Sequence, residues 1–120
     1  MENKRLSLGE WRFMNIIWAN EPIGSGELVK LTHEQLGWAK STMYTRLRLL
    51  AEKGYIANTE TVVTSLISQE QAQAIESNIV VNESFGGSLP GFIAAFFGNR
   101  KITGEEAADL ERLIREYKEG

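Results

Sequence analysis

The residues with the most chemistry to offer lie in one segment, residues 40–53. Read as a helix with about 100° per residue, this segment places Met43, Leu47 and Leu50 on one side. The other side carries three hydroxyl groups and a guanidinium, on Ser41, Tyr44, Thr45 and Arg48. Arginine bonds bidentately to guanine, and hydroxyl groups bond phosphates or base edges. The segment therefore predicts a helix that packs with one face and offers the other to DNA.

The local charge of this segment agrees with such a partner. Residues 40–53 hold four cations against the single anion Glu52, a net charge of +3, although the whole chain of 120 residues carries −3. Because the field that a partner meets is local, an acidic chain can still present a basic face. The predicted DNA-contacting residues are Lys40, Ser41, Thr42, Tyr44, Thr45, Arg46 and Arg48.

Simpler interpretations of the same helix face remain open. A polar helix face is often only solvated, and short motifs carry a risk of false positives. Tyr44 would then be a half-buried core residue. Arg46, near the packed side, would lie along it and reach a phosphate only with its tip.

The composition gives little support to catalysis or metal binding. The chain has no Cys and a single His, His33, which excludes a thiolate site and a His-based metal cluster. The glycine-rich stretch at 85–88 lacks a neighbouring Lys, so we interpret it as a turn between helices rather than a phosphate loop. Glu105 and Glu106 belong in the first turn of a helix, where they complement its dipole. We expect no enzyme activity, no cofactor and no metal site.

Other elements must hold the segment 40–53 in place. The sequence predicts six helices, including this one, and one β pair. Capping boxes, in which a Ser or Thr and a Glu or Gln three residues later cap each other's backbone, begin at Ser7, Ser68 and Thr103. Ser25 and Ser88 offer further N-caps. The expected helices span about 8–20, 25–36, 40–53, 68–85, 88–97 and 103 onward, with β-branched strands at 55–60 and 61–67.

This order of elements predicts a fold that is mainly α with a small β hairpin. A helix-turn-helix at 25–53 followed by a hairpin is the order of a winged helix. The β pair separates residues 1–67, with eight Lys/Arg against seven Asp/Glu, from residues 68–120, with five against nine. We therefore expect a winged-helix DNA-binding domain at 1–67 and a helical dimerisation domain at 68–120.

The last two predicted helices carry more apolar surface than so short a chain can cover. A large exposed apolar patch indicates association, so we expect a homodimer built on these helices. The alternative is that they only cover residues 1–67 of their own chain. The predicted dimerisation residues are Phe85, Leu89, Phe92, Ile93, Phe96, Phe97, Leu110, Leu113, Ile114 and Tyr117.

Nothing in the sequence favours a membrane. The longest apolar runs, 16–19 and 92–97, fall well short of the roughly 18 residues that span a bilayer. Residues 1–5 are charged, but the apolar stretch of a signal peptide does not follow. Surface docking is also disfavoured, since interfacial helices prefer Lys and Arg to the acidic residues found here. We expect a cytoplasmic protein without membrane insertion.

Three sets of residues resemble one known family along nearly the whole chain. Its first helix is similar to Leu8-x-x-Trp11-x-x-Met14-x-x-Ile17-Trp18. Its recognition helix and the exit into the wing are similar to Ser41-Thr42-Met43-Tyr44-Thr45, Leu47, Leu50 and Lys53-Gly54-Tyr55-Ile56. Its dimerisation domain is similar to Phe85-Gly86-Gly87-Ser88 and Thr103-x-x-Glu106 with Leu110. The sequence thus resembles the penicillinase repressors, a family that also holds the methicillin-resistance and copper-transport repressors.

The resemblance implies a homodimer of winged-helix chains that binds a palindromic double-stranded operator and blocks transcription. It also implies an inducing signal, delivered either by a membrane sensor whose metalloprotease cuts the repressor or by copper. Genes of the β-lactam-resistance type would be among the targets.

The sequence departs from the family pattern in three places. The family's longer, basic wing corresponds to residues 57–66, which hold no Lys or Arg. The cysteines of the copper branch are absent, which excludes direct thiolate sensing. The family is cut at an Asn-Phe bond, and the matching bond here is Ala95-Phe96. Besides repression, two other functions remain open: a dimeric interaction module of the same fold with weak or no sequence-specific DNA binding, and a ligand-sensing regulator.

Overall fold

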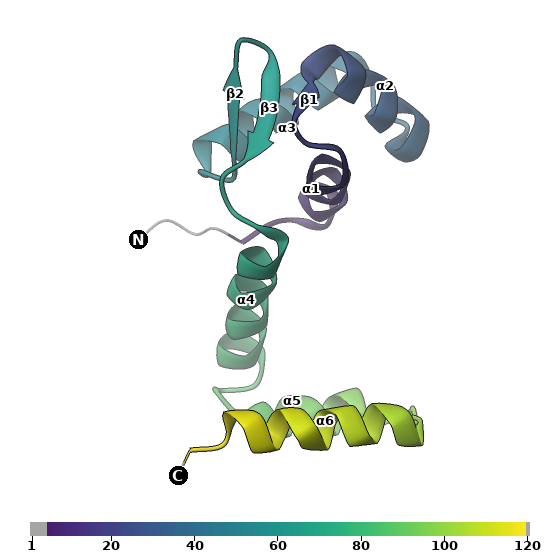
Figure 1. The fold of residues 1–120 in the computed structure, drawn as a ribbon, viewed down its shortest axis with the longest axis vertical. Coiled ribbons are helices and arrows are strands. Elements are labelled where there is room, and N and C mark those ends of the chain that lie inside the picture. Colours follow the sequence, from purple (N-terminus) through teal and green to yellow (C-terminus); the bar gives the residue numbers. More distant parts are fainter. Residues whose placement is uncertain (1–4, 120) are drawn as a thin grey trace. The chain divides into compact units, whose positions relative to one another are not determined.

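The computed structural model describes residues 5–119, which fall into two compact units divided between Val80 and Val81 (Figure 1). Residues 1–4, which belong to the charged segment 1–5 discussed above, lie outside this range. The first unit holds α1 (Leu8–Asn20), β1 (Ile23–Gly24), α2 (Ser25–Leu36), α3 (Lys40–Glu52), β2 (Ile56–Thr59), β3 (Val62–Ser65) and α4 (Gln69–Ile79). A π-helical turn, Val80–Ser84, runs across the division, and the second unit holds α5 (Leu89–Phe96) and α6 (Gly104–Tyr117).

Four helices, α1, α4, α5 and α6, start where the capping residues predicted them. Complete capping boxes are present at Ser7 with Glu10, at Ser68 with Gln71 and at Thr103 with Glu106. Ser88 accepts a hydrogen bond of 2.9 Å from the Gly91 N–H at the start of α5. These contacts satisfy backbone N–H groups that have no partner inside the helix, so they mark the first turn independently of tertiary packing.

A short turn sets the angle between α2 and α3. Gly37 adopts φ +72° at the end of α2, a left-handed conformation that costs glycine little. Three residues later α3 begins, at Lys40. Trp38, in this turn, packs edge-on against Phe13 of α1 with ring centroids 5.1 Å apart. The turn and this aromatic contact hold α3 against the first helix.

One hydrophobic core lies in the first unit and takes residues from α1, α2, α3 and the sheet. Its fully buried members are Phe13, Met14, Ile17, Leu28, Met43, Leu50, Tyr55, Ile56 and Val63. The helix α1 is the central helix of this core for most of its length. Leu8 is the exception: it is 66% exposed, because it lies in the first turn, before the core begins.

The sheet has three antiparallel strands in the order β1-β3-β2, one more than the sequence predicted. Ile23 pairs with Val63 and Gly24 with Val62, so the Pro/Gly segment after α1 is a strand as well as a helix stop. The predicted hairpin is confirmed as β2 and β3. Its turn uses Glu60 and Thr61 with φ of 52° and 66°, positive values that fit a tight hairpin turn even without glycine.

Two predicted helix boundaries were wrong. Ser25 is the first residue of α2 rather than its N-cap, because strand pairing continues through Gly24 and the Ser25 N–H donates to the Thr61 carbonyl at 2.8 Å. The helix expected at 68–85 stops being α-helical at Ile79 and continues as the π-helical turn. The break falls in the β-branched run 79–81, where restricted side-chain rotation lowers helix propensity.

Among residues 5–119, no single helix is long and apolar enough to cross a membrane. One bent pair of helices, 69–84 with 89–96, meets the length and composition requirement when its two parts are taken together.

A buried ion pair joins the end of α3 to the start of α1. Lys53 Nζ lies 2.7 Å from Glu10 Oε1, and the Glu10 side chain is only 4% exposed. Glu10 Oε1 also accepts the Ser7 N–H at 2.9 Å, within the capping box. Burial alone would raise the pKa of Glu10, but the hydrogen bonds from Lys53 and Ser7 and the charge of Lys53 outweigh it and lower the pKa below 4.5.

We predict that Glu10→Gln destabilises the first unit in a pH-dependent way. Glutamine keeps the acceptor for Ser7 but loses the ion pair, at a cost of about 1–2 kcal/mol at neutral pH. Because the folded-state pKa of Glu10 is lowered, its stabilisation is present above pH 4.5 and is lost as the pH falls through the folded value. Urea unfolding followed by tryptophan fluorescence measures this, since Trp11, Trp18 and Trp38 all lie in the first unit.

Glu34→Gln, at an exposed position of α2, is the matched control and should unfold like the wild type at every pH. A stability difference between wild type and Glu10→Gln that stays constant from neutral to acid pH would contradict the assignment.

Candidate nucleic-acid interface

The helix α3 has one packed and one exposed face, as the sequence predicted. Met43, Leu47 and Leu50 are buried against the core of the first unit. All seven predicted DNA-contacting residues are exposed: Lys40, Ser41, Thr42, Tyr44, Thr45, Arg46 and Arg48. Because the packed face anchors the helix, the hydroxyl and cationic groups project from a rigid element. Contact of these residues with DNA stays a prediction.

The first turn of α3 combines a cation with free backbone donors. Its N-cap, Ala39, has no side-chain oxygen to cap the backbone N–H groups that follow. Lys40 occupies the first helical position and is exposed. The N-terminus of a helix carries a partial positive charge and attracts phosphate oxygens. Within the chain, the charge of Lys40 and the partial positive charge of the helix N-terminus repel each other. Beside a phosphate, both charges are attractive.

Tyr44 is neither a core residue nor a free one. It is 38% exposed, and its hydroxyl donates to Ser25 Oγ over 3.3 Å. Ser25 is itself buried, and its N–H donates to the Thr61 carbonyl in the hairpin turn. This contact ties the exposed face of α3 to the start of α2 and to the tip of the wing, so Tyr44 contributes to the shape of the face.

Arg48 forms a weak contact on its own helix. Its Nη1 lies 3.3 Å from Glu52 Oε2, one turn further on, and both side chains are more than 60% exposed. Exposed pairs of this kind contribute little to stability. Arg48 can therefore exchange Glu52 for a base edge or a phosphate at small cost. Arg46 is exposed beside it.

The hairpin of β2 and β3, which is the wing of the first unit, carries no cation. Its strands and turn lack Lys and Arg, and Glu60 is exposed at the tip. Val62 and Leu66 are also exposed on it. An acidic tip is repelled by phosphates, so the wing does not contribute to the attraction for a nucleic acid.

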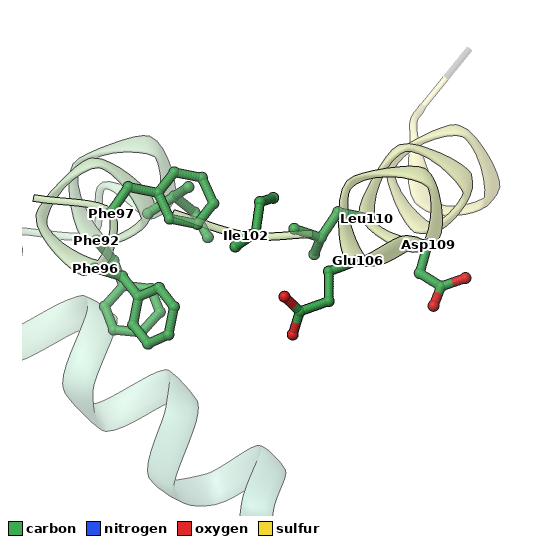
Figure 2. Close-up of a pocket in the computed structure, with 8 residues that line it drawn as sticks. Phe92, Phe96, Phe97, Ile102, Glu106, Asp109 and Leu110 are labelled. Atoms are coloured by element: carbon green, nitrogen blue, oxygen red, sulfur yellow. The ribbon is translucent and has the colours of Figure 1, made fainter. Parts of the chain in front are cut away.

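The second unit presents an apolar groove between α5 and α6 (Figure 2). The rings of Phe92, Phe96 and Phe97 project from α5, Ile102 lies between the helices, and Leu110 faces them from α6. The groove has a volume of about 360 Å³ and is further lined by Ile93, Glu106 and Asp109.

The ten predicted dimerisation residues divide into two groups. Phe85, Phe92, Ile93 and Phe97 are half-buried within their own chain, where Phe85 and Phe92 pack edge to face with centroids 5.4 Å apart. The others are exposed: Leu89, Phe96, Leu110, Leu113, Ile114 and Tyr117. On α6 the exposed members form one apolar stripe, with Ile114 65% and Tyr117 79% exposed.

Two other candidate sites are the predicted cleavage bond and the single histidine. The Ala95-Phe96 bond lies in the last turn of α5, and both residues are exposed. His33 is exposed in the last turn of α2, and its Nδ1 lies 3.3 Å from the carbonyl of Trp38 in the turn that follows. Within residues 5–119, no group of three His, Asp or Glu side chains is arranged to hold a metal ion.

Comparison with known proteins identifies the family to which this arrangement belongs. A family model described as penicillinase repressor matches residues 6–116. The chain is 25% identical over 118 residues to the penicillinase repressor of Bacillus licheniformis, covering 95% of this chain and 92% of the relative. It is 24% identical over 120 residues to the methicillin resistance regulatory protein MecI of Staphylococcus aureus strain Mu50, covering 95% and 98%.

A penicillinase repressor of Staphylococcus aureus is 22% identical over 122 residues, with 97% of each chain covered. The matches thus include the winged unit and the helices of the second unit together. The chain belongs to the penicillinase repressor family.

Proposed function

We propose that this protein is a dimeric transcriptional repressor that binds a palindromic DNA operator. The family supports repression, since the relatives are named as penicillinase repressors and as a methicillin resistance regulatory protein. The observation that carries the proposal is the exposed hydroxyl and cationic face of α3, on a helix whose other face is buried.

In this proposal α3 enters the major groove as the second helix of a helix-turn-helix. The first residues of such a helix reach base edges and the neighbouring phosphates. Lys40, Ser41 and Thr42 in the first turn then bind the backbone. Arg48, whose contact with Glu52 is weak, reads a guanine with its two parallel N–H donors. Because the wing lacks cations, we assign phosphate attraction to α3.

The dimer in this proposal is built on the second unit. A single chain leaves the apolar stripe of α6 and parts of α5 in contact with water, which is unfavourable. Packing two copies about a two-fold axis would cover both stripes and present two α3 helices to successive major grooves. A two-fold protein requires a site with the same symmetry, hence the palindrome. DNA binding of this kind places the protein in the cytoplasm.

Induction by proteolysis stays a prediction. The Ala95-Phe96 bond belongs to α5, so it must leave the helix to enter an active site. A cut there would separate α6 from the rest of the chain and remove half of the proposed dimer surface. The membrane sensor protease implied by the resemblance would be the partner in that step.

We predict that Arg48→Ala weakens operator binding by about 1–3 kcal/mol, the value of a bidentate contact to a base. Alanine favours the helix, so the fold should persist. The measurement is a fluorescence-anisotropy titration of a duplex recovered by selection from genomic DNA, at fixed salt. Binding should also weaken steeply with salt, because neutralised phosphates release counterions.

Arg12→Ala is the matched control, since Arg12 is exposed on α1 and its loss changes the net charge equally. Equal affinities of Arg48→Ala and Arg12→Ala would remove Arg48 from the interface. A flat salt response of the wild type would instead favour the alternative of an interaction module that does not bind DNA.

We predict that Leu113→Asp converts the dimer to a monomer. Leu113 is 42% exposed in the single chain, so aspartate leaves the folded unit intact but buries a charge without a partner in the dimer. Sedimentation equilibrium measures the mass, and binding to the palindrome should fall as the dimer is lost.

Ala108→Asp adds the same charge on α6, about 160° around the helix from Leu110, and should remain dimeric. If Leu113→Asp keeps the dimer mass of the wild type, the stripe on α6 is not the dimer surface.

A further inference from the structure

A chain of polar contacts within the first unit leads from the end of α3 to the middle of α4. Lys53, which follows α3, donates to the Arg5 carbonyl at 3.0 Å as well as to Glu10. The Arg5 side chain continues the path, with its Nη2 3.0 Å from Glu76 Oε2 on α4. The backbone beside Arg5 is held in place, because Leu6 is buried in the core. A displacement of α4 is therefore opposed by groups attached to the helix that carries the DNA-contacting residues.

Several other contacts hold the beginning of α4. Ala72 is buried in the core, and the Trp18 indole N–H donates to the Ile67 carbonyl at 3.0 Å. Gln69 Nε2 lies 3.3 Å from Asn15 Oδ1 of α1. Glu76 lies one turn beyond Ala72, nearer the point where the chain enters the second unit. The ion pair with Arg5 thus extends the anchored part of α4 by a further turn.

This ion pair is a poor way to gain stability. Glu76 Oε1 is buried and has no hydrogen-bond partner in the described part of the chain. Leaving a carboxylate oxygen unsatisfied is unfavourable, and an apolar pair of similar size would avoid that penalty. The nearby Tyr55 is affected as well: burial and the charges of Glu10 and Glu76 raise the pKa of its hydroxyl. A directional contact of this kind is better suited to fixing the orientation of a helix than to stabilising it.

We propose that Arg5 and Glu76 are positioning residues that fix the direction of α4 relative to α3, and that they thereby make the repressor selective for the spacing of the two operator half-sites. This inference rests on the proposed dimeric DNA binding. In a dimer the path from one α3 to the other passes through both α4 helices. One added base pair shifts a half-site by about 3.4 Å and turns it by about a tenth of a helical turn. Two α3 helices whose directions relative to α4 are fixed by this pair would follow that change less readily.

The test compares Glu76→Gln with wild type on three duplexes. The first is a palindrome selected from random DNA with the wild-type protein, the second has its spacer lengthened by one base pair, and the third holds one half-site. We expect the wild type to bind the lengthened duplex about tenfold more weakly than the palindrome. For Glu76→Gln we expect the same change of duplex to weaken binding by less than about threefold, because the interaction between Arg5 and Glu76 has been removed. Both proteins should bind the single half-site equally.

Glu70→Gln is the matched control, because Glu70 is exposed in the first turn of the same helix and its change alters the charge equally. Arg5→Gln should reproduce the effect of Glu76→Gln, and the double variant should go no further than either single one. Hydrogen exchange adds a readout without DNA: amides of 76–79 should exchange faster in Glu76→Gln, and those of α1 should not.

Three results would overturn the inference: Glu76→Gln discriminates spacers as the wild type does, it binds the single half-site more weakly, or its α4 amides stay protected. If the wild type binds no duplex at all, the proposed function fails first, and the inference fails with it.

Discussion

The ion pair between Lys53 and Glu10 joins the end of α3 to the first turn of α1, and the winged unit depends on this connection. Glu10 begins α1, the central helix of the core, and Lys53 ends α3 at the point where the chain turns into β2. The two residues lie 43 positions apart in the sequence, so the pair closes a long loop that holds all of α2 and the turn into α3. Its burial makes it directional, because a desolvated carboxylate must keep its cation close.

The functional surface follows from this anchoring. The same helix whose end is held by Glu10 buries Met43, Leu47 and Leu50 and so has no freedom to rotate. Its remaining face collects cations within a chain of net charge −3. In the proposed function the attraction for phosphates is assigned to α3, because the tip of the wing is acidic. Charge distribution, not total charge, makes DNA binding compatible with this composition.

A different constraint applies to the second unit, which is too small to form a hydrophobic core of its own. Two helices and a connecting segment cannot enclose the aromatic residues of α5, which pack on each other and line a groove instead. The apolar stripe of α6 stays exposed. Small helical units reach stability by association when a single chain lacks enough core. Membership of the penicillinase repressor family and the proposed dimer both accord with this shortage.

Interactions between residues close in sequence could be predicted without the structure. A capping box joins residues three positions apart, and a helix face repeats within one or two turns. The helix starts marked by capping boxes, the two faces of α3 and the stripe of α6 were therefore predicted correctly. Contacts between distant residues could not be predicted, because periodicity carries no information about which segments meet. The strand β1, the Lys53–Glu10 pair and the Arg5–Glu76 pair, whose members lie 71 residues apart, depend on the folded core bringing separate segments together.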